Sequence, residues 1–372
     1  MDCPETEGEA AALVRDAFER AKPLAIVGGN TRSGLGRPVQ AARTLSSRGL
    51  TGITAYEPQE MVISARAGTP MREIEAALLE HRQRLAFEPI DHRALLGTEG
   101  EPTIGGVAAT NASGPRRLVV GAARDALLGL RLVNGLGEVV AAGGRVMKNV
   151  TGLDVPKVVA GSFGTLGLVT EVTFKVQPVP EHEATLVWAD AREPAALLAA
   201  AMATSCEPTG AAIVSGHATI RLEGLEASVS DRAARLEGAL RSFGTPERLS
   251  VEHSRSFWRG VRDVADHMSG DAPVWRLSVA PSDGPTVAAC IGAPALFDWQ
   301  GGLVWLRTEA DHETVRAAVD AVGGHATLVR APEPVRAAVP VFHPPSPGVA
   351  RLAARVREAF DPKGIMNPGR MG

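Results

Sequence analysis

The sequence is poor in cysteine and lacks long apolar runs. Its three cysteines, Cys3, Cys206 and Cys290, stand far apart. They form no Cys-x-x-Cys motif and no spacing typical of zinc or an iron–sulfur cluster, and they fit a reducing compartment. The acidic N-terminal stretch has no apolar core like that of a secretory signal. The least polar stretch, about Gly284 to Phe297, is shorter than the roughly 20 residues that span a bilayer, so we expect at most peripheral membrane contact.

An excess of positive charge is absent too. Lysine and arginine number 39 against 42 acidic residues, which leaves a formal charge of −3. No basic run is interleaved with aromatic residues, so we expect no nucleic-acid partner. Glycine and proline are abundant, at 40 and 26 residues in a chain that is 45% hydrophobic, which is typical of a globular protein with many turns. The length of 372 residues indicates more than one domain.

Apolar periodicity predicts a mixture of helices and strands, hence an α+β protein. Thr69-Pro70 and Asp311 have the form of helix starts, and Gly244 has the form of a helix end. Helices are expected over 9–21, 71–81, 225–243, 311–322 and 349–360, and strands over 24–27, 53–56, 61–65, 127–133, 138–142, 168–176 and 303–306.

Three glycine-rich segments fall within the first 180 residues: Val27–Gly34, Thr103–Arg117 and Met147–Val176. Backbone N–H groups in such loops can approach an anion because no side chains block them. The first loop lacks the Gly-Lys-Ser/Thr of a P-loop and the Gly-x-Gly-x-x-Gly of a dinucleotide fingerprint. Each segment alone is compatible with a structural turn or corner. Together they predict an extended cofactor with a pyrophosphate and two ring systems.

Motifs along nearly the whole chain resemble those of the vanillyl-alcohol oxidase/p-cresol methylhydroxylase superfamily, and within it the FAD-binding subunits of glycolate oxidases. The resemblance rests on specific short motifs rather than on glycine content. They are Gly28-Gly29-Asn30-Thr31, Tyr56-Glu57-Pro58, 65–70 (ARAGTP), Thr103-Ile104-Gly105-Gly106, 113–117 (SGPRR), 121–125 (GAARD), 146–150 (VMKNV), Gly164-Thr165-Leu166-Gly167, 275–278 (WRLS), 301–306 (GGLVWL), Phe360-Asp361-Pro362 and 367–370 (NPGR).

The resemblance implies an α+β fold with a two-lobed PCMH-type FAD-binding domain over 1–180, an α+β cap domain over 181–345, and a C-terminal segment, 346–372, that returns to the FAD domain. It implies FAD as the cofactor, with the first two glycine-rich segments on the pyrophosphate and the third along the flavin. The implied FAD-binding residues are Val27, Gly28, Gly29, Asn30, Thr31, Gly34, Thr103, Gly105, Gly106, Asn111, Ser113, Gly114, Gly161, Gly164, Gly167, Val169 and Asn367.

Two departures from the family pattern are informative. Many relatives attach FAD through a histidine directly after the paired glycines, but Asn30 stands there, so we expect noncovalent FAD. Relatives that oxidise 2-hydroxy acids alone often carry HxGDGN and EHG motifs that bind a metal, and neither is present, so no metal is expected. The histidines of the expected cap are scattered instead: His217, His253, His267, His312, His325 and His343.

The resemblance implies oxidation of glycolate, or a close 2-hydroxy acid such as D-lactate, to the 2-oxo acid by hydride transfer to FAD N5. Such chemistry needs a cation for the carboxylate and a base for the hydroxyl proton. Arg276 is our candidate for the first, ahead of Arg259 and Arg307, because its planar fork binds a carboxylate through two hydrogen bonds. His343 is the candidate base. Structural roles for each of these residues remain open.

Without cysteines for a cluster, electrons from reduced FAD must leave to oxygen, to a soluble acceptor or to a partner. The resemblance implies partners, a paralogous FAD subunit and an iron–sulfur subunit, in a cytoplasmic complex at the inner face of the membrane. Two alternatives stay open. The chain could be a non-catalytic subunit that holds FAD or relays electrons, or a stand-alone FAD-dependent oxidase of sugars or alditols.

Overall fold

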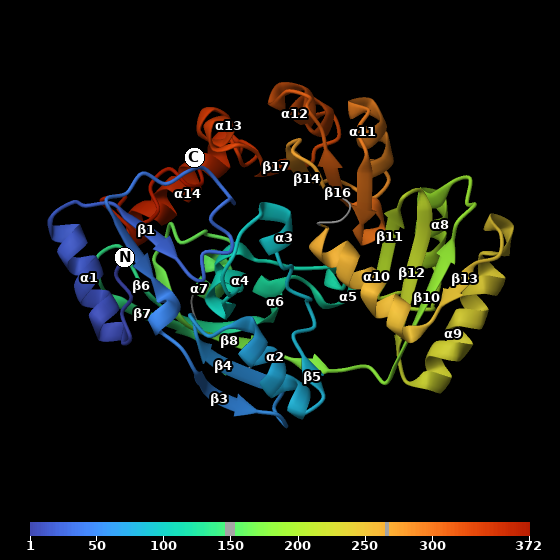
Figure 1. Cartoon of the computed structure of the whole chain (residues 1–372), viewed down its shortest axis with the longest axis horizontal. Coiled ribbons are helices and arrows are strands. Elements are labelled where there is room, and N and C mark those ends of the chain that lie inside the picture. The colour runs from blue at the N-terminus through green and yellow to red at the C-terminus, as the bar shows by residue number, and fades with distance from the viewer. Residues whose placement is uncertain (146–152, 265–267) are drawn as a thin grey trace. The chain divides into compact units, whose positions relative to one another are not determined.

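The computed structural model describes residues 1–145, 153–264 and 268–372, so the 146–150 motif and His267 lie outside the described residues. The chain divides into two compact units, each with its own sheet (Figure 1). The first comprises Met1–Ser113, Gly121–Pro178 and Glu333–Gly372, and the second comprises Gly114–Val120 and Val179–Pro332. No helix in the described part of the chain is both long and apolar enough to cross a membrane.

The first unit contains a five-stranded antiparallel sheet of order β3-β4-β8-β6-β7 and a separate parallel pair, β1-β2. A third, short pair joins β5 to β9. Its helices are α1 (Glu7–Glu19), α2 (Met71–Glu80), α3 (Arg93–Leu96), α4 (Ile104–Thr110), α6 (Ala123–Ala126), α7 (Val155–Val159), α13 (Glu333–Ala338) and α14 (Pro347–Phe360), with a 3-10 turn, η1 (Ser47–Gly49). Its strands are β1 (Leu24–Val27), β2 (Arg43–Ser46), β3 (Ile53–Glu57), β4 (Val62–Arg66), β5 (Gln83–Arg84), β6 (Leu127–Val133), β7 (Val139–Gly143), β8 (Leu168–Lys175) and β9 (Gln177–Pro178).

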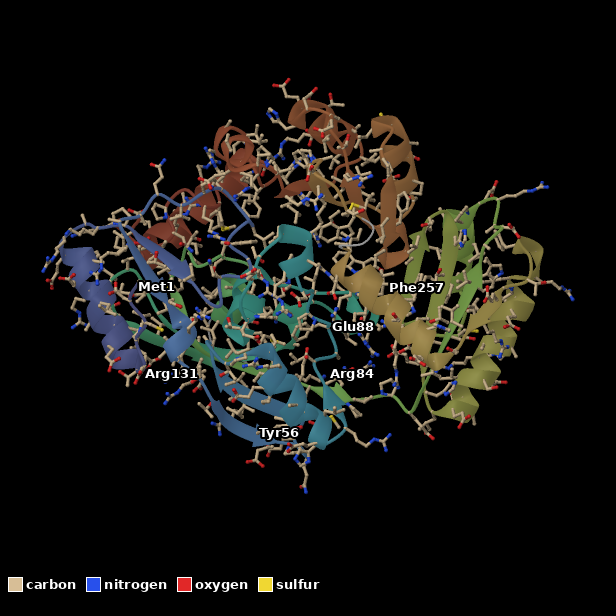
Figure 2. The ribbon with its side chains drawn as sticks, in the orientation of Figure 1. Met1, Tyr56, Arg84, Glu88, Arg131 and Phe257 are labelled. Atoms are coloured by element: carbon tan, nitrogen blue, oxygen red, sulfur yellow. The ribbon has the colours of Figure 1, made fainter. Side chains whose placement is uncertain are left out.

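Helix α1 packs its apolar side, Ala10, Val14 and Ala17, into a core shared with β1 and β2. Thr6 caps its first turn, since the Thr6 side chain accepts a hydrogen bond from the N–H of Glu9 (3.2 Å). On its other side, Glu7 forms an ion pair of 2.5 Å with Arg131 of β6, which Figure 2 labels. The helix therefore ties the parallel pair to the larger sheet.

The structure contains the predicted strand Leu24–Val27 but lacks the predicted cap of α2. The strand is present as β1. Helix α2 begins after Pro70, but Thr69 does not cap it, because the Thr69 hydroxyl donates to the carbonyl of Arg66 (2.7 Å) instead. A second difference lies in the glycine-rich segment 103–114, which contains the short helix α4, capped by Thr103.

The second unit is built on an eight-stranded sheet of order β13-β10-β12-β11-β15-β16-β14-β17, in which all neighbouring pairs are antiparallel. The prediction that Asp311 caps α12 is confirmed by a 2.7 Å hydrogen bond from the N–H of Thr314. Its strands are β10 (His182–Trp188), β11 (Gly210–Val214), β12 (His217–Gly224), β13 (Glu247–Leu249), β14 (Val274–Ser278), β15 (Ala295–Asp298), β16 (Leu303–Arg307) and β17 (His325–Arg330). Its helices are α5 (Arg117–Val120), α8 (Pro194–Met202), α9 (Glu226–Ala239), α10 (Val251–Asp263), α11 (Gly284–Ile291) and α12 (His312–Asp320), with 3-10 turns η2 (Arg241–Phe243) and η3 (Trp299–Gly301).

Asp361 attaches the C-terminal segment to the first unit. Its buried carboxylate accepts hydrogen bonds from the N–H groups of Ile365 (3.0 Å) and Met366 (2.8 Å). The N–H of Leu24 in β1 in turn donates to the carbonyl of Ile365 (2.8 Å). The turn after α14 thus delivers the last residues of the chain alongside β1.

We expect Asp361→Ala to lower the free energy of unfolding by about 3 kcal/mol, because two buried N–H groups lose a charged acceptor. Denaturant titration followed by circular dichroism measures this. Glu358→Ala, at an exposed position of α14, is the control and should change stability little. Equal stability of the two variants would contradict the role given to Asp361.

Candidate functional site

The loop that follows β1 leaves its backbone donors open. The N–H groups of Gly29, Asn30, Thr31 and Arg32 donate to no acceptor within the described residues. Asn30 has a φ of 62°, a left-handed conformation that non-glycine residues rarely adopt. Consecutive free N–H groups around a left-handed residue form a concave surface that binds anions. The loop therefore has the open donors and the left-handed residue that are typical of an anion-binding turn.

Close backbone packing explains two glycines at this site. A Cβ on Gly29 would lie 1.6 Å from the carbonyl oxygen of Glu101, and a Cβ on Gly105 would lie 2.5 Å from the Cβ of Ala67. No side chain larger than hydrogen fits at either position without moving the backbone. The two glycine-rich segments thus pack closely against Glu101 and Ala67.

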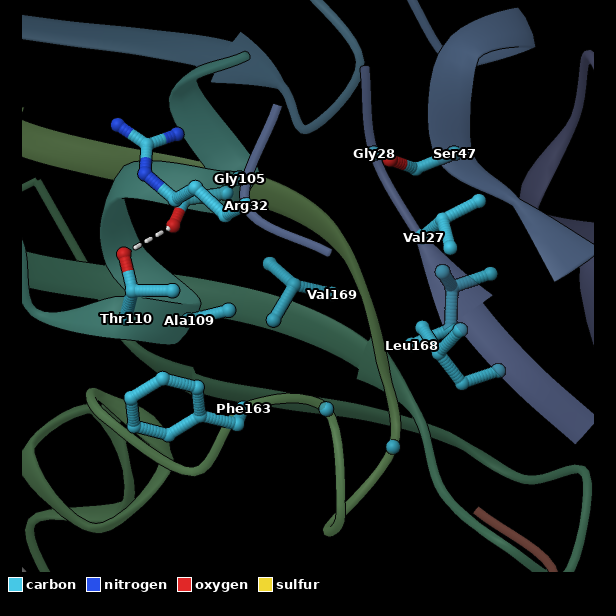
Figure 3. A pocket seen from close by; sticks show the side chains of 14 residues that line it. Val27, Gly28, Arg32, Ser47, Gly105, Ala109, Thr110, Phe163, Leu168 and Val169 are labelled. Atoms are coloured by element: carbon cyan, nitrogen blue, oxygen red, sulfur yellow. Dashed lines mark hydrogen bonds between the residues drawn. The ribbon is translucent and has the colours of Figure 1, made fainter. Parts of the chain in front are cut away.

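 These segments border two adjoining pockets, and every residue that lines either pocket belongs to the first unit. The residues common to both pockets are Val27, Gly28, Arg32 and Gly106, and Thr31 borders the smaller pocket alone. Figure 3 shows the larger pocket, with Phe163 on one side and Arg32 beside the first turn of α4. The predicted residues that the structure brings together here are Val27, Gly28, Gly29, Asn30, Thr31, Thr103, Gly105, Gly106, Gly164, Gly167 and Val169.

The other predicted cofactor residues lie outside this lining. Asn111 and Ser113 support the backbone, since their side chains accept hydrogen bonds from the N–H groups of Arg124 and Ala123 (both 2.9 Å). Gly114 belongs to the second unit. Gly34 and Gly161 lie in loops beside α3 and α4, where Gly34 faces Leu96 and Gly161 faces Asn111.

Asn367, also predicted at the cofactor site, joins three segments of the first unit. Its side-chain oxygen accepts from the N–H of Ile26 (2.7 Å), and its amide nitrogen donates to the carbonyls of Ile26 (3.3 Å) and Phe163 (2.8 Å). Ile26 and Phe163 both line the larger pocket. Asn367 therefore positions two walls of the pocket through its backbone contacts.

Comparison with known proteins identifies the family. A family profile described as "FAD binding domain" matches residues 1–143. The chain is 36% identical over 361 residues to glycolate oxidase subunit GlcE of Escherichia coli (strain K12), covering 96% of this chain and 95% of that protein. The chain belongs to the family of this subunit. The predicted cofactor, FAD, and the predicted membership of the FAD-dependent oxidoreductases are confirmed.

Other family relatives match over shorter stretches. A D-lactate dehydrogenase of Archaeoglobus fulgidus is 31% identical over 176 residues, which are 47% of this chain and 38% of that protein. Among solved structures, 4-ethylphenol oxidase from Gulosibacter chungangensis superposes with a TM-score of 0.71 at 12% identity, over 99% of this chain and 88% of that chain. This likeness confirms the predicted PCMH-type α+β fold.

The pocket of the first unit fits the diphosphate of the family's cofactor. Four open N–H groups supply donors, and the glycines let an extended molecule lie against the main chain. Arg32, which is not among the predicted cofactor residues, adds a positive charge that borders both pockets. Its Nη1 lies 3.1 Å from the point where a Cβ on Gly106 would stand. An arginine directly after a glycine loop is the signal that could have identified it.

The side chain of Arg32 is buried, and two of its nitrogens donate hydrogen bonds to neighbouring groups of the protein. Its Nε donates to Nδ1 of His92 (3.3 Å), and its Nη2 donates to the carbonyl of Ile90 (3.1 Å). Because a guanidinium only donates, Nδ1 of His92 is an acceptor, and the neutral ring carries its proton on Nε2. Nη1 makes no hydrogen bond within the described residues. It is the part of the guanidinium left for a ligand.

The charge of Arg32 is weakly compensated. Burial lowers the pKa of Arg32 to about 10, and the nearby carboxylate of Asp91 opposes this shift. Burial by itself would raise the pKa of Asp91, but hydrogen bonds from Arg93 and the charges of Arg93 and Arg32 bring it below its ordinary value. Arg93 shares that carboxylate at 2.7 Å. An anion in the pocket would stabilise the Arg32 guanidinium.

The two predicted catalytic residues belong to different units. Arg276 lies in β14 of the second unit, with its Cζ 5.1 Å from the ring centre of Trp299. His343 lies between α13 and α14 of the first unit and is half-buried. Its neighbour Phe342 packs edge-on against Phe163 of the pocket, at 5.0 Å between ring centres. Among the described residues, no group of histidine, cysteine and carboxylate side chains could hold a metal ion.

We expect Gly29→Ala to purify with little or no flavin, because the added Cβ displaces the loop from Glu101. The ratio of visible flavin absorbance to protein absorbance measures the loss. Gly8→Ala, where an added Cβ meets nothing within 4 Å, should keep the wild-type ratio. A fully loaded Gly29→Ala protein would refute the placement of the loop.

Arg32→Met keeps much of the side-chain volume and removes the charge. We expect FAD to bind roughly ten- to a hundredfold more weakly, the effect of one hydrogen bond to a charged group. Titration of the apoprotein with FAD, followed by quenching of flavin fluorescence, gives the dissociation constant. Arg20→Met, at an exposed position of α1, is the matched control, and equal constants for the two variants would count against a role for Arg32.

Proposed function

We propose that this chain is the FAD-binding subunit of a glycolate oxidase or dehydrogenase complex. It oxidises glycolate, or a close 2-hydroxy acid such as D-lactate, to the 2-oxo acid. The observation that carries the proposal is the similarity to a GlcE subunit over 96% of the chain, together with a first unit whose pocket fits FAD. Shorter matches to proteins named D-lactate dehydrogenase and D-2-hydroxyglutarate dehydrogenase support the substrate class.

The proposed domain organisation follows the sequence: an FAD-binding domain over 1–180, a cap over 181–345 and a returning tail over 346–372. The predicted cofactor residues of the first unit and Arg32 hold FAD. We propose that the bond is noncovalent, because Asn30 stands where many relatives carry the linking histidine. When bound, FAD supplies a two-electron acceptor for the hydride of C2.

The reaction also needs groups of the protein for the carboxylate and for the hydroxyl proton. We assign the carboxylate to the guanidinium of Arg276, because a half-buried arginine can form two parallel hydrogen bonds with it. A ring nitrogen of His343 is the proposed acceptor for the hydroxyl proton. The substrate thus loses a hydride and a proton and becomes the 2-oxo acid.

Partner chains receive the electrons in this proposal. A 42% identical match over 85 residues to glycolate oxidase subunit GlcD of Bacillus subtilis supports a complex that contains a paralogous FAD subunit. An iron–sulfur subunit would complete the route, and the complex would lie in the cytoplasm at the inner face of the membrane.

The same match supports a second candidate function. Since two similar chains carry the name of one enzyme, this chain could hold FAD and relay electrons while its paralogue performs the oxidation. Both candidates use the FAD pocket. They differ in whether this chain alone accepts a hydride from the substrate.

We expect glycolate and D-lactate to bleach the visible absorbance of the FAD-loaded chain when they are mixed without oxygen. Glycolamide, which lacks the carboxylate, and xylitol are the control compounds and should leave the flavin oxidised. A flavin that is reduced only after a GlcD-type subunit is added would favour the second candidate. Bleaching by xylitol alone would replace both candidates with a sugar or alditol oxidase.

A further inference from the structure

We propose that Arg117 and Arg276 act together as a carboxylate clamp around the indole ring of Trp299, and that the clamp binds a small monocarboxylate. The clamp deepens the proposed function, on which it rests for the identity of the acid. Binding of a carboxylate at this point is a separate property of the second unit. Arg117 and Trp299 acquire a role that the sequence did not suggest.

Three separate segments of the second unit meet at the clamp. Arg117 begins α5, Arg276 lies in β14, and Trp299 begins the turn between β15 and β16. The guanidinium carbons of Arg117 and Arg276 lie 4.5 Å and 5.1 Å from the centre of the Trp299 ring. Each distance is within the range of a cation–π contact. One indole therefore contacts two guanidinium groups, and the charge of Arg117 acts on Arg276.

This arrangement has an electrostatic cost. Burial, and after it the positive charge of Arg117, lower the pKa of Arg276 to about 10, while the carboxylate of Asp298 acts in the opposite direction. The guanidinium of Arg276 donates to no acceptor within the described residues. Like charges brought together and partly desolvated destabilise a protein unless an anion compensates them. The pair is consistent with a site whose ligand is negatively charged.

Hydrogen bonds within the protein hold the turn that carries Trp299. The indole Nε1 donates to the carbonyl of Gly114 (3.1 Å), and the Trp299 N–H donates to the carboxylate of Asp298 (2.7 Å). Trp299 and Gln300 have φ values of 50° and 63°, two successive left-handed residues without glycine. Such strain is found at binding sites, where the surrounding structure over-determines the backbone. The ring is thus a rigid platform for both arginines.

A buried ion pair fixes the other side of the clamp. Arg116, next to Arg117, lies 2.5 Å from the carboxylate of Glu223 in β12, and Arg221 lies 3.5 Å from the same carboxylate. Arg116 and Glu223 are both buried. The start of α5 is therefore attached to the sheet, which positions the backbone of Arg117.

The geometry of the donors indicates the class of ligand. The two oxygens of a carboxylate match the parallel donors of a guanidinium. The 2-hydroxy acids of the proposed function belong to this class.

The test uses the full-length, FAD-loaded chain and oxamate, a small monocarboxylate that cannot be oxidised to a 2-oxo acid. Isothermal titration should give a dissociation constant for the wild type, and glycolamide, which is neutral, should bind far more weakly. We expect Arg276→Gln and Arg117→Gln each to weaken oxamate binding roughly ten- to a hundredfold, the effect of hydrogen bonds to a charged group. Arg351→Gln, an exposed arginine of α14, is the matched control.

Flavin content and melting temperature establish that each variant is folded. Trp299→Leu removes the platform and should weaken oxamate binding as well, with FAD still bound. The clamp is overturned if oxamate does not bind the wild type, or if both arginine variants bind it as the wild type does. It is also overturned if Arg351→Gln loses as much affinity as they do, since the attraction would then be nonspecific.

Anaerobic reduction by glycolate separates the clamp from the proposed function. Oxamate binding that depends on both arginines, in a chain whose flavin glycolate never reduces, supports the clamp while the proposed oxidation fails. Reduction of the wild type with an unchanged half-saturating glycolate concentration in both arginine variants overturns the clamp while the oxidation stands.

Discussion

The first unit depends on main chain that packs closely on one side and remains open on the other. The loop after β1 presses Gly29 against the carbonyl of Glu101, yet the N–H groups from Gly29 to Arg32 have no acceptor within the described residues. Unpaired backbone donors are costly unless solvent or a ligand satisfies them. A diphosphate can satisfy several such donors at once, so the proposed cofactor would remove this cost.

The surroundings of the loop preserve this open arrangement. Asn367 and Asp361 attach the C-terminal segment to β1, so residues from both ends of the chain define one pocket wall. His92 and the carbonyl of Ile90 fix Arg32 without neutralising it, because neither carries a negative charge as an acceptor. A neutral support leaves the charge of Arg32 for the anion. Arg276 likewise contacts an uncharged group, the indole ring of Trp299.

Much of the fold was accessible from local signals. The strand Leu24–Val27 and the cap at Asp311 appear as expected, because apolar runs and capping side chains act within a few residues. The predicted cap at Thr69 is absent, because the Thr69 hydroxyl donates to the carbonyl of Arg66, a contact that the local sequence does not reveal. Helix α4 was obscured by Gly105 and Gly106, which weaken the helical pattern although the backbone there is helical.

The sequence by itself determined the family, the FAD cofactor and the glycine segments that approach it, because these depend on short motifs and on residues that lack side chains. Only the tertiary structure decided which polar side chains face a ligand and which support the backbone. Asn111, Ser113 and Asn367 make backbone contacts, whereas Arg32 borders the pocket. The physical reason is that the burial of a side chain and its contacts depend on residues that are distant in the sequence. Arg117 and Trp299 are an example, since no local sequence pattern predicts their contact.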